Sequence, residues 1–126
     1  QEVIDFLSPQ GFSVIDFDDL SFWEQVVLMK NVKEFVSIHG AGFSNIIFMN
    51  ADGKITELIN EAYAELEYTF PFWKQAYTCG HSYTPIFGKP VNETTLLIDS
   101  QTQVHSGELL VNQNIVVDVQ ELEISK

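Results

Sequence analysis

The chain contains no arginine, and its six lysines stand against eighteen aspartate and glutamate residues, which gives a formal net charge of −12. An acidic surface of this kind repels the phosphates of nucleic acids and of anionic lipids, so we exclude both as partners. The shortage of positively charged side chains also matters for any anion site, because such sites usually contain an arginine or a well-placed lysine.

Cysteine is nearly absent as well. Cys79 stands alone, so no internal disulfide can form, which fits a reducing compartment. No apolar run reaches the roughly 18 residues that a membrane-spanning helix needs, and no signal peptide is visible. We therefore expect no transmembrane segment and a cytoplasmic protein, or one in the secretory-pathway lumen if its source is eukaryotic. His81 and His105 have no partners at metal-ligand spacing, so no metal site is predicted.

The first residue is Gln1 rather than methionine. Together with the lack of arginine, this predicts that the 126 residues are part of a longer protein that carries its cationic residues elsewhere. The length suits one domain, and an apolar content of 45% with ten phenylalanines favours a packed globule over a disordered chain.

Hydrophobic periodicity predicts helices and strands in alternation along residues 1–126. The run 35–38 scarcely alternates, as in a parallel strand that is covered on both faces. Ser21 and Glu24 form a capping-box pattern, and Gly53 suits the left-handed position of a turn. The predicted elements are helix 1–7, strand 12–17, helix 21–31, strand 35–38, helix 43–49, strand 54–59, helix 71–79, edge strand 81–87, short strands near 104 and 109–111, an apolar run at 115–117 and a last turn begun by Asp118. This order predicts one α/β domain with a Rossmann-like, mainly parallel sheet flanked by helices.

The strand at 35–38 is followed by His39 and by the turn Gly40-Ala41-Gly42, which leads into a run with helical apolar spacing. In a strand–turn–helix arrangement, the N–H groups at the helix start can bind an anion. Glycines let the backbone approach a phosphate without a Cβ in the way. We interpret this stretch as a site for a nucleotide diphosphate, specifically that of a nucleotide sugar.

An acidic residue stands at a suggestive distance from this turn. Glu57 follows Gly40 by 17 residues, which resembles the spacing of the acid that holds the ribose hydroxyls in dinucleotide-binding domains. His39 and Glu57 are both expected at or near the carboxyl ends of parallel strands, where ligands bind. Asn45 occupies the place of the third glycine of G-x-G-x-x-G, so an ordinary dinucleotide domain is not predicted.

Each candidate has a purely structural alternative. Gly40 and Gly42 can simply form a strand-to-helix turn, and Glu57 can be a solvated carboxylate at a strand end. His39 taken alone fits a hydrogen-bonded structural histidine better than a catalyst. Asn45 can bind a loop carbonyl instead of a ligand. An aromatic cluster follows the predicted strand at 54–59: Tyr63, Tyr68, Phe70, Phe72 and Trp73. Packing over the hydrophobic core explains these rings better than stacking on a base or sugar does.

Three blocks of sequence carry a resemblance to a known family: LSFWEQVVL at 20–28, VSIHGAGFSNIIFM at 36–49 and ITEL at 55–58. Together they resemble the C-terminal half of family 61 glycosyltransferases. That family includes bacterial capsular-polysaccharide proteins, plant xylosyltransferases and animal O-linked N-acetylglucosaminyltransferases. Phe43 stands where leucine is more usual, and residues 84–114 carry no resemblance.

The resemblance implies one lobe of a two-lobed, GT-B-like enzyme, with residues 1–126 as most of the C-terminal lobe that binds the donor. It implies an inverting transfer of a hexosyl or pentosyl group from a UDP-sugar or similar donor to a hydroxyl of a glycan or protein, as in capsular or extracellular polysaccharide biosynthesis. No metal or other cofactor is expected. The implied donor-binding residues are His39, Gly40, Ala41, Gly42 and Asn45 at the diphosphate and sugar, and Glu57 at the ribose.

The same resemblance leaves part of the machinery outside the chain. The catalytic base is not identified in residues 1–126, and His39 is the one candidate for a catalytic role. The family carries an arginine-bearing segment just upstream of the helix that begins at Gln1, so the fragment alone is expected to be inactive. The missing N-terminal lobe is thus an expected partner.

Two other functions stay open at this point. A non-catalytic α/β module that binds a nucleotide or another protein would keep the same fold, because a fold does not determine its chemistry. A methyltransferase-like site predicts binding of S-adenosylmethionine, but its glycine loop usually follows the first strand of the sheet.

Overall fold

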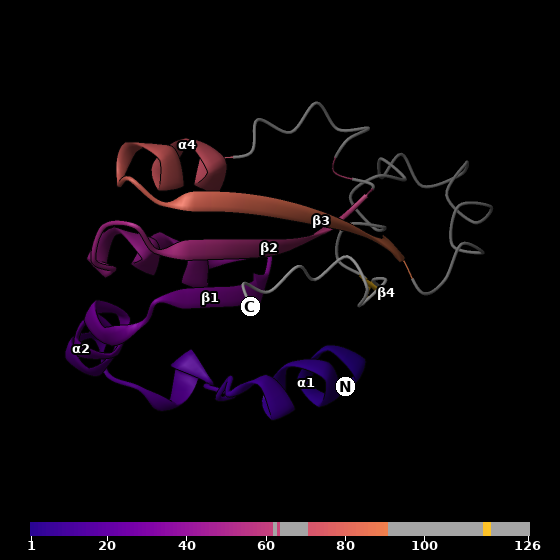
Figure 1. Cartoon of the computed structure of the whole chain (residues 1–126), viewed down its shortest axis with the longest axis horizontal. Helices are drawn as coiled ribbons and strands as arrows, with labels where there is room; N and C mark the ends of the chain where they lie inside the picture. The colour runs from indigo at the N-terminus through magenta and orange to yellow at the C-terminus, as the bar shows by residue number, and fades with distance from the viewer. Residues whose placement is uncertain (62, 64–70, 91–114, 117–126) are drawn as a thin grey trace, which may run out of the picture.

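The computed structural model describes residues 1–61, 63, 71–90 and 115–116. At its centre three parallel strands, β1 (Glu34–Ile38), β2 (Lys54–Asn60) and β3 (Ser82–Pro90), lie side by side in chain order (Figure 1). A short antiparallel strand, β4 (Ile115–Val116), pairs with the end of β3. The predicted α/β class with a parallel sheet flanked by helices is confirmed for this part of the chain.

The described helical segments lie ahead of β1, between β1 and β2, and between β2 and β3. The helices are α1 (Glu2–Leu7), α2 (Phe22–Asn31) and α4 (Pro71–Thr78), with 3-10 turns η1 (Ser8–Gln10) and η2 (Phe17–Asp19) and the longer 3-10 helix η3 (Ala41–Phe48). The capping box at the start of α2 is confirmed. The Glu24 N–H donates to Ser21 Oγ at 3.4 Å, and the Ser21 N–H donates to Glu24 Oε2 at 2.8 Å.

Side chains alternate along β2 and divide the core between the two faces of the sheet. Ile55 packs on the face covered by α2, η3 and α4, in a cluster with Met29, Phe43, Ile46, Met49 and Ala76. Leu58 packs on the opposite face with Leu7 of α1 and Ile86 of β3. Since Glu57 has the same parity as Ile55, its side chain lies on the helix-covered face, where it is 1% exposed.

The predicted strand at 12–17 is wrong. Its alternating pattern is real, but no described strand pairs with it, and η2 begins at Phe17. Val14 and Ile15 are 65% and 48% exposed, so the apolar positions of the segment do not enter the core. Alternation alone cannot produce a strand that has no hydrogen-bonding neighbour.

Two local predictions also need correction. The helix expected at 43–49 is a 3-10 helix that begins at Ala41. In the following turn the left-handed residue is Asp52, with φ of 68°, and not Gly53. Gly53 has a different reason to be glycine: a Cβ there would lie 2.6 Å from Met49 Cε and 3.1 Å from His81 Nδ1.

Several predictions lie outside the described residues. These are the strands near 104 and 109–111, the turn begun by Asp118, and the positions of Tyr68 and Phe70 in the aromatic cluster. Among the helices that the structure describes, none combines the length and the apolar content that crossing a bilayer requires.

Candidate functional site

A chain of three polar side chains runs across the sheet at the end of β1. His39 follows β1 directly, and its Nδ1 is hydrogen-bonded to Glu57 Oε1 on the neighbouring strand. The Tyr83 hydroxyl, from β3, donates to Glu57 Oε2. Both carboxylate oxygens are therefore engaged inside the protein, which is how a carboxylate becomes tolerable in an apolar core.

Strand register explains why these residues meet. β1 and β2 pair Ser37 with Glu57, so His39 lies two positions along on the same face of the sheet. Tyr83 pairs with Ile55, one same-face step before Glu57, and a tyrosine is long enough to reach a diagonal neighbour. The Nδ1 side of the His39 ring thus faces the Glu57 carboxylate, and an N–H at Nδ1 can donate to it.

Aromatic rings enclose the His39 imidazole. Its centroid lies 4.9 Å from that of Tyr63 and 5.4 Å from that of Phe72, which in turn packs 5.2 Å from Phe43. The His39 side chain keeps 13% of its surface exposed. Packing on two sides and the Glu57 hydrogen bond hold the ring in one orientation.

The glycine turn next to His39 leaves backbone donors available. The first bond into η3 runs from the Phe43 N–H to the Gly40 carbonyl at 3.1 Å. Within the described part of the chain, the N–H groups of Ala41 and Gly42 have no acceptor. Adjacent amides at the start of a helix form a concave donor set that suits an anion.

The two glycines of this turn differ in their surroundings. Gly40 is extended, with φ of 165° and ψ of 177°, and a Cβ there would meet nothing closer than the Ile38 carbonyl oxygen at 3.9 Å. The fold itself therefore tolerates a side chain at Gly40. A Cβ on Gly42 would lie 3.1 Å from the Phe17 ring, so packing restricts that position.

Asn45 faces the neighbouring helix. Its Nδ2 donates to Gln25 Oε1 at 2.8 Å, while Gln25 Nε2 donates to the carbonyls of Phe17 and Leu20 at 3.0 and 3.1 Å. These bonds tie η3 to α2 and to the segment before it. The donor end of the Asn45 amide thus has a structural partner, and a ligand could use only its other atoms without breaking that bond.

The distribution of lysines matters for an anion at this edge. Lys33 and Lys54 lie at the amino ends of β1 and β2, which is the opposite edge of the sheet from His39. Lys89 lies at the carboxyl end of β3, one register position beyond the pair of Asn60 with Gly88. Sequence reasoning missed both Lys89 and Tyr83. The strand register brings Lys89 to this edge, and Tyr83 reaches Glu57 from the amino-terminal part of β3.

The described residues contain no group of three or more His, Cys, Asp or Glu side chains that could hold a metal ion. The described residues of the site supply backbone donors, one oriented imidazole and the aromatic rings around it. Such a set can bind a phosphate-bearing ligand beside the imidazole.

Residues 1–56 match the family model Glycosyltransferase 61. The match covers less than half of the 126 residues, and over that part it supports the resemblance to family 61 glycosyltransferases. The matched part includes His39, the glycine turn and Asn45, and it ends one residue before Glu57. The comparisons with curated proteins and with solved structures found no match.

Proposed function

We propose that residues 1–126 form the donor-binding part of an inverting glycosyltransferase that uses a nucleotide-diphosphate sugar, such as a UDP-sugar. The observation that carries this proposal is the pair of amides at Ala41 and Gly42, which have no acceptor in the described part of the chain and which follow His39, the residue whose imidazole Glu57 holds. This arrangement lies within the residues that match family 61. The role fits capsular or extracellular polysaccharide biosynthesis in a longer, two-lobed protein.

In the proposed reaction, a hydroxyl oxygen of the acceptor attacks the anomeric carbon on the face opposite the diphosphate. The bond from that carbon to the diphosphate oxygen breaks, and the leaving group departs with the electron pair. The amides of Ala41 and Gly42 stabilise the charge that develops on it, and His39 contacts the diphosphate or the sugar. The catalytic base and further positive charge come from outside the described residues.

The structure suggests a specific role for Glu57. Because both of its oxygens are bound within the protein, we propose that Glu57 positions His39. Contact with the ribose, the role first expected of it, would require Glu57 to give up one of these partners. Gly40, where the chain leaves space for a Cβ, is proposed as the point at which a ligand approaches the backbone most closely.

A second candidate is a non-catalytic α/β module that has kept the fold. The internal engagement of Glu57 and Asn45 favours it, because both residues then serve the structure alone. The net charge of −12 also favours the non-catalytic module, because an acidic surface repels the negative charge of a diphosphate.

Titration calorimetry with UDP, UDP-N-acetylglucosamine and UDP-xylose separates the two candidates. We expect UDP to bind the natural full-length polypeptide, and binding to weaken in Gly40→Ala while the fold is retained. If none of the three ligands binds the full-length protein, the glycosyltransferase proposal is excluded and the non-catalytic module is favoured.

A further inference from the structure

A cavity of about 530 Å³ lies at the amino-terminal edge of the sheet, opposite the edge that holds His39. Its lining comes from the end of α2, the start of β1 and the turn that leads from η3 into β2, with residues 30–34 and 50–54. The cavity therefore lies apart from the glycine turn and from the proposed donor site.

Three of the six lysines in the chain line this cavity. Lys30 lies in the last turn of α2, Lys33 directly precedes β1, and Lys54 begins β2. The Lys54 N–H donates to the Lys33 carbonyl at 2.8 Å, so these two lysines lie side by side at the ends of neighbouring strands. Among the described residues, no ion pair joins any of the three lysines to a carboxylate. Their charges are therefore available to an anion in the cavity.

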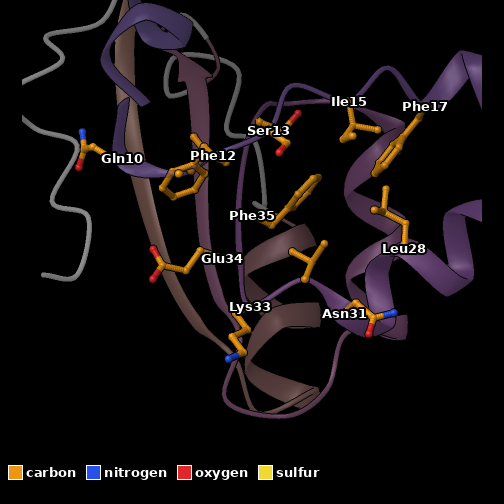
Figure 2. Close-up of a pocket in the computed structure, with 14 residues that line it drawn as sticks. Gln10, Phe12, Ser13, Ile15, Phe17, Leu28, Asn31, Lys33, Glu34 and Phe35 are labelled. Carbon is orange, nitrogen blue, oxygen red and sulfur yellow. The ribbon is translucent and has the colours of Figure 1, made fainter. Parts of the chain in front are cut away.

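The lining also contains two carboxylates, those of Glu34 and Asp52. Three positive and two negative side chains give the lining a formal charge of +1, whereas the charge of the whole chain is −12. Figure 2 draws a neighbouring cavity along β1 and shows that the side chains of Lys33 and Glu34 extend in different directions. The chain as a whole repels anions, and this cavity is a local exception to that repulsion.

Lys30 has a structural alternative, because a lysine near the end of a helix interacts favourably with the free carbonyls there. Two of those carbonyls have other donors. Asn50 Nδ2 donates to the Lys30 carbonyl at 2.7 Å, and the Val32 N–H donates to the Met29 carbonyl at 3.2 Å. These bonds also reduce the negative potential of the helix end, which would otherwise oppose an anion in the cavity. The alternative does not apply to the other two lysines, which lie at strand ends.

The turn that leads into β2 adds backbone donors. Within the described part of the chain, the N–H groups of Asn50 and Ala51 have no acceptor. Both residues are exposed and line the cavity. Asp52, next in the turn, is left-handed with φ of 68°, and a turn with such a residue can direct neighbouring N–H groups toward one point. Lysine ammonium groups beside free amides are donors that bind phosphate in proteins.

We propose that this cavity binds the phosphate group of a small molecule, with Lys30, Lys33 and Lys54 as its cationic contacts and the amides of Asn50 and Ala51 as further donors. The volume of about 530 Å³ lies within the roughly 300–1,000 Å³ of small-molecule sites. Lysine binds phosphate as a point charge, so three lysines around one cavity can contact a single dianion from several sides. Because the site lies at the opposite edge of the sheet from the glycine turn, it does not depend on the proposed function.

Titration of the full-length polypeptide with inorganic phosphate, followed by NMR, tests the proposal. We expect saturable shifts of the Ala51 and Lys54 amide signals that sodium chloride at matched ionic strength does not reproduce. The amides of Ala41 and Gly42 report on the glycine turn, so the two sites are distinguished in one titration. Absence of a saturable shift at Ala51 and Lys54 would overturn the proposal.

Lysine variants assign the contacts. Lys33→Gln and Lys54→Gln should each weaken the phosphate affinity measured at the Ala51 amide about tenfold, the equivalent of one charge-assisted hydrogen bond. Both side chains are exposed, so the fold is retained. Lys74→Gln changes an exposed lysine of α4 outside the cavity, and as the matched control it should alter the affinity by about twofold or less. Equal weakening by Lys74→Gln and Lys54→Gln would show that only the overall charge matters and would overturn the proposal.

Removal of a carboxylate from the lining should have the opposite effect. Asp52→Asn keeps a residue type that adopts the left-handed conformation and removes one negative charge, so we expect phosphate to bind severalfold more tightly. Asp5→Asn removes the same charge from α1, outside the cavity, and should leave the affinity nearly unchanged. Equal gains in the two variants would overturn the proposal. Saturable binding of oligoglutamate without binding of phosphate would identify an acidic polypeptide as the occupant and would also overturn it.

Discussion

The Glu57 carboxylate, on β2, is hydrogen-bonded to the imidazole of His39, the residue that directly follows β1. This contact links the β1–β2 pair to the candidate ligand site, because His39 is also the residue that precedes the glycine turn. Glu57 thus has a structural role, and under the proposed function it also positions His39; substitutions can separate the two roles.

Replacing Glu57 by alanine leaves the His39 Nδ1–H and the Tyr83 hydroxyl without their buried acceptor. We expect Glu57→Ala to lower the free energy of unfolding by roughly 1–3 kcal/mol for each of these two hydrogen bonds that it removes. Glu57→Gln keeps an acceptor oxygen and should cost less than Glu57→Ala. Urea unfolding measures both variants, with Tyr83→Phe as the control that removes one donor and leaves the carboxylate in place. A loss in Glu57→Ala no larger than that in Tyr83→Phe would contradict the proposed positioning role.

Gly40 offers the cleanest test of ligand approach. A methyl group there meets no atom of the described chain within 3.9 Å, so Gly40→Ala should unfold at nearly the wild-type temperature. If the diphosphate lies against this turn, affinity for UDP falls by about tenfold or more, equivalent to the loss of one charge-assisted hydrogen bond. Calorimetry on the full-length polypeptide measures this, with Ala51→Gly as a remote control in an exposed turn. Unchanged affinity in Gly40→Ala would mean that the ligand does not approach the backbone there.

Local patterns identified most of the elements correctly from sequence. The capping box at Ser21 and Glu24 identified the start of α2, and the apolar run at 35–38 identified the parallel strand β1. These signals work because the residues that decide the structure are adjacent in the chain. The expectation that this strand is covered on both faces is wrong, because β1 lies at the edge of the sheet, none of its residues is fully buried and Ile38 is 63% exposed. The strand predicted at 12–17 failed because pairing depends on a neighbour that the pattern of the segment itself cannot supply.

In the candidate site, too, the features set by neighbouring residues could be predicted and those set by distant residues could not. His39 and the glycine turn are contiguous, so their proximity was visible in the sequence. The environment of Glu57 was not, because its burial depends on Tyr83, 26 residues further along, and on the β2–β3 register. The expected ribose contact rested on spacing and on the family resemblance, and neither carries information about which side-chain atoms are already bound.

Gly53 should be intolerant of substitution for a packing reason. A Cβ at this position would overlap Met49 Cε at 2.6 Å and approach His81 Nδ1 to 3.1 Å. Met49 can move, but the buried His81 ring is held by the bond between its Nε2 and the Ile46 carbonyl at 3.1 Å. We expect Gly53→Ala to destabilise the fold by roughly 1–3 kcal/mol, as overpacked cores do. Thermal unfolding of Gly53→Ala and of Gly40→Ala measures the difference. Equal unfolding midpoints for the two variants would refute the steric argument.

The capping box predicts a pH dependence with a defined sign. The hydrogen bonds from the Ser21 hydroxyl and backbone hold the pKa of Glu24 below its ordinary value of 4.5. A carboxyl whose pKa is lower in the folded state stabilises that state above its unfolded pKa. This contribution is therefore present near neutral pH, declines once the pH drops below about 4.5, and is lost as the pH falls through the lowered value.

Glu24→Gln should consequently lower the thermal midpoint near neutral pH and converge with the wild type in acid. Ser21→Ala removes the principal cause of the lowered pKa, so its difference from the wild type should also shrink as the pH falls. Glu2 in α1 is the matched control, because it is an exposed glutamate in a first helical turn that lacks a side-chain cap. A midpoint difference for Glu24→Gln that stays constant from neutral pH into acid would show that the carboxylate charge contributes nothing to the start of α2.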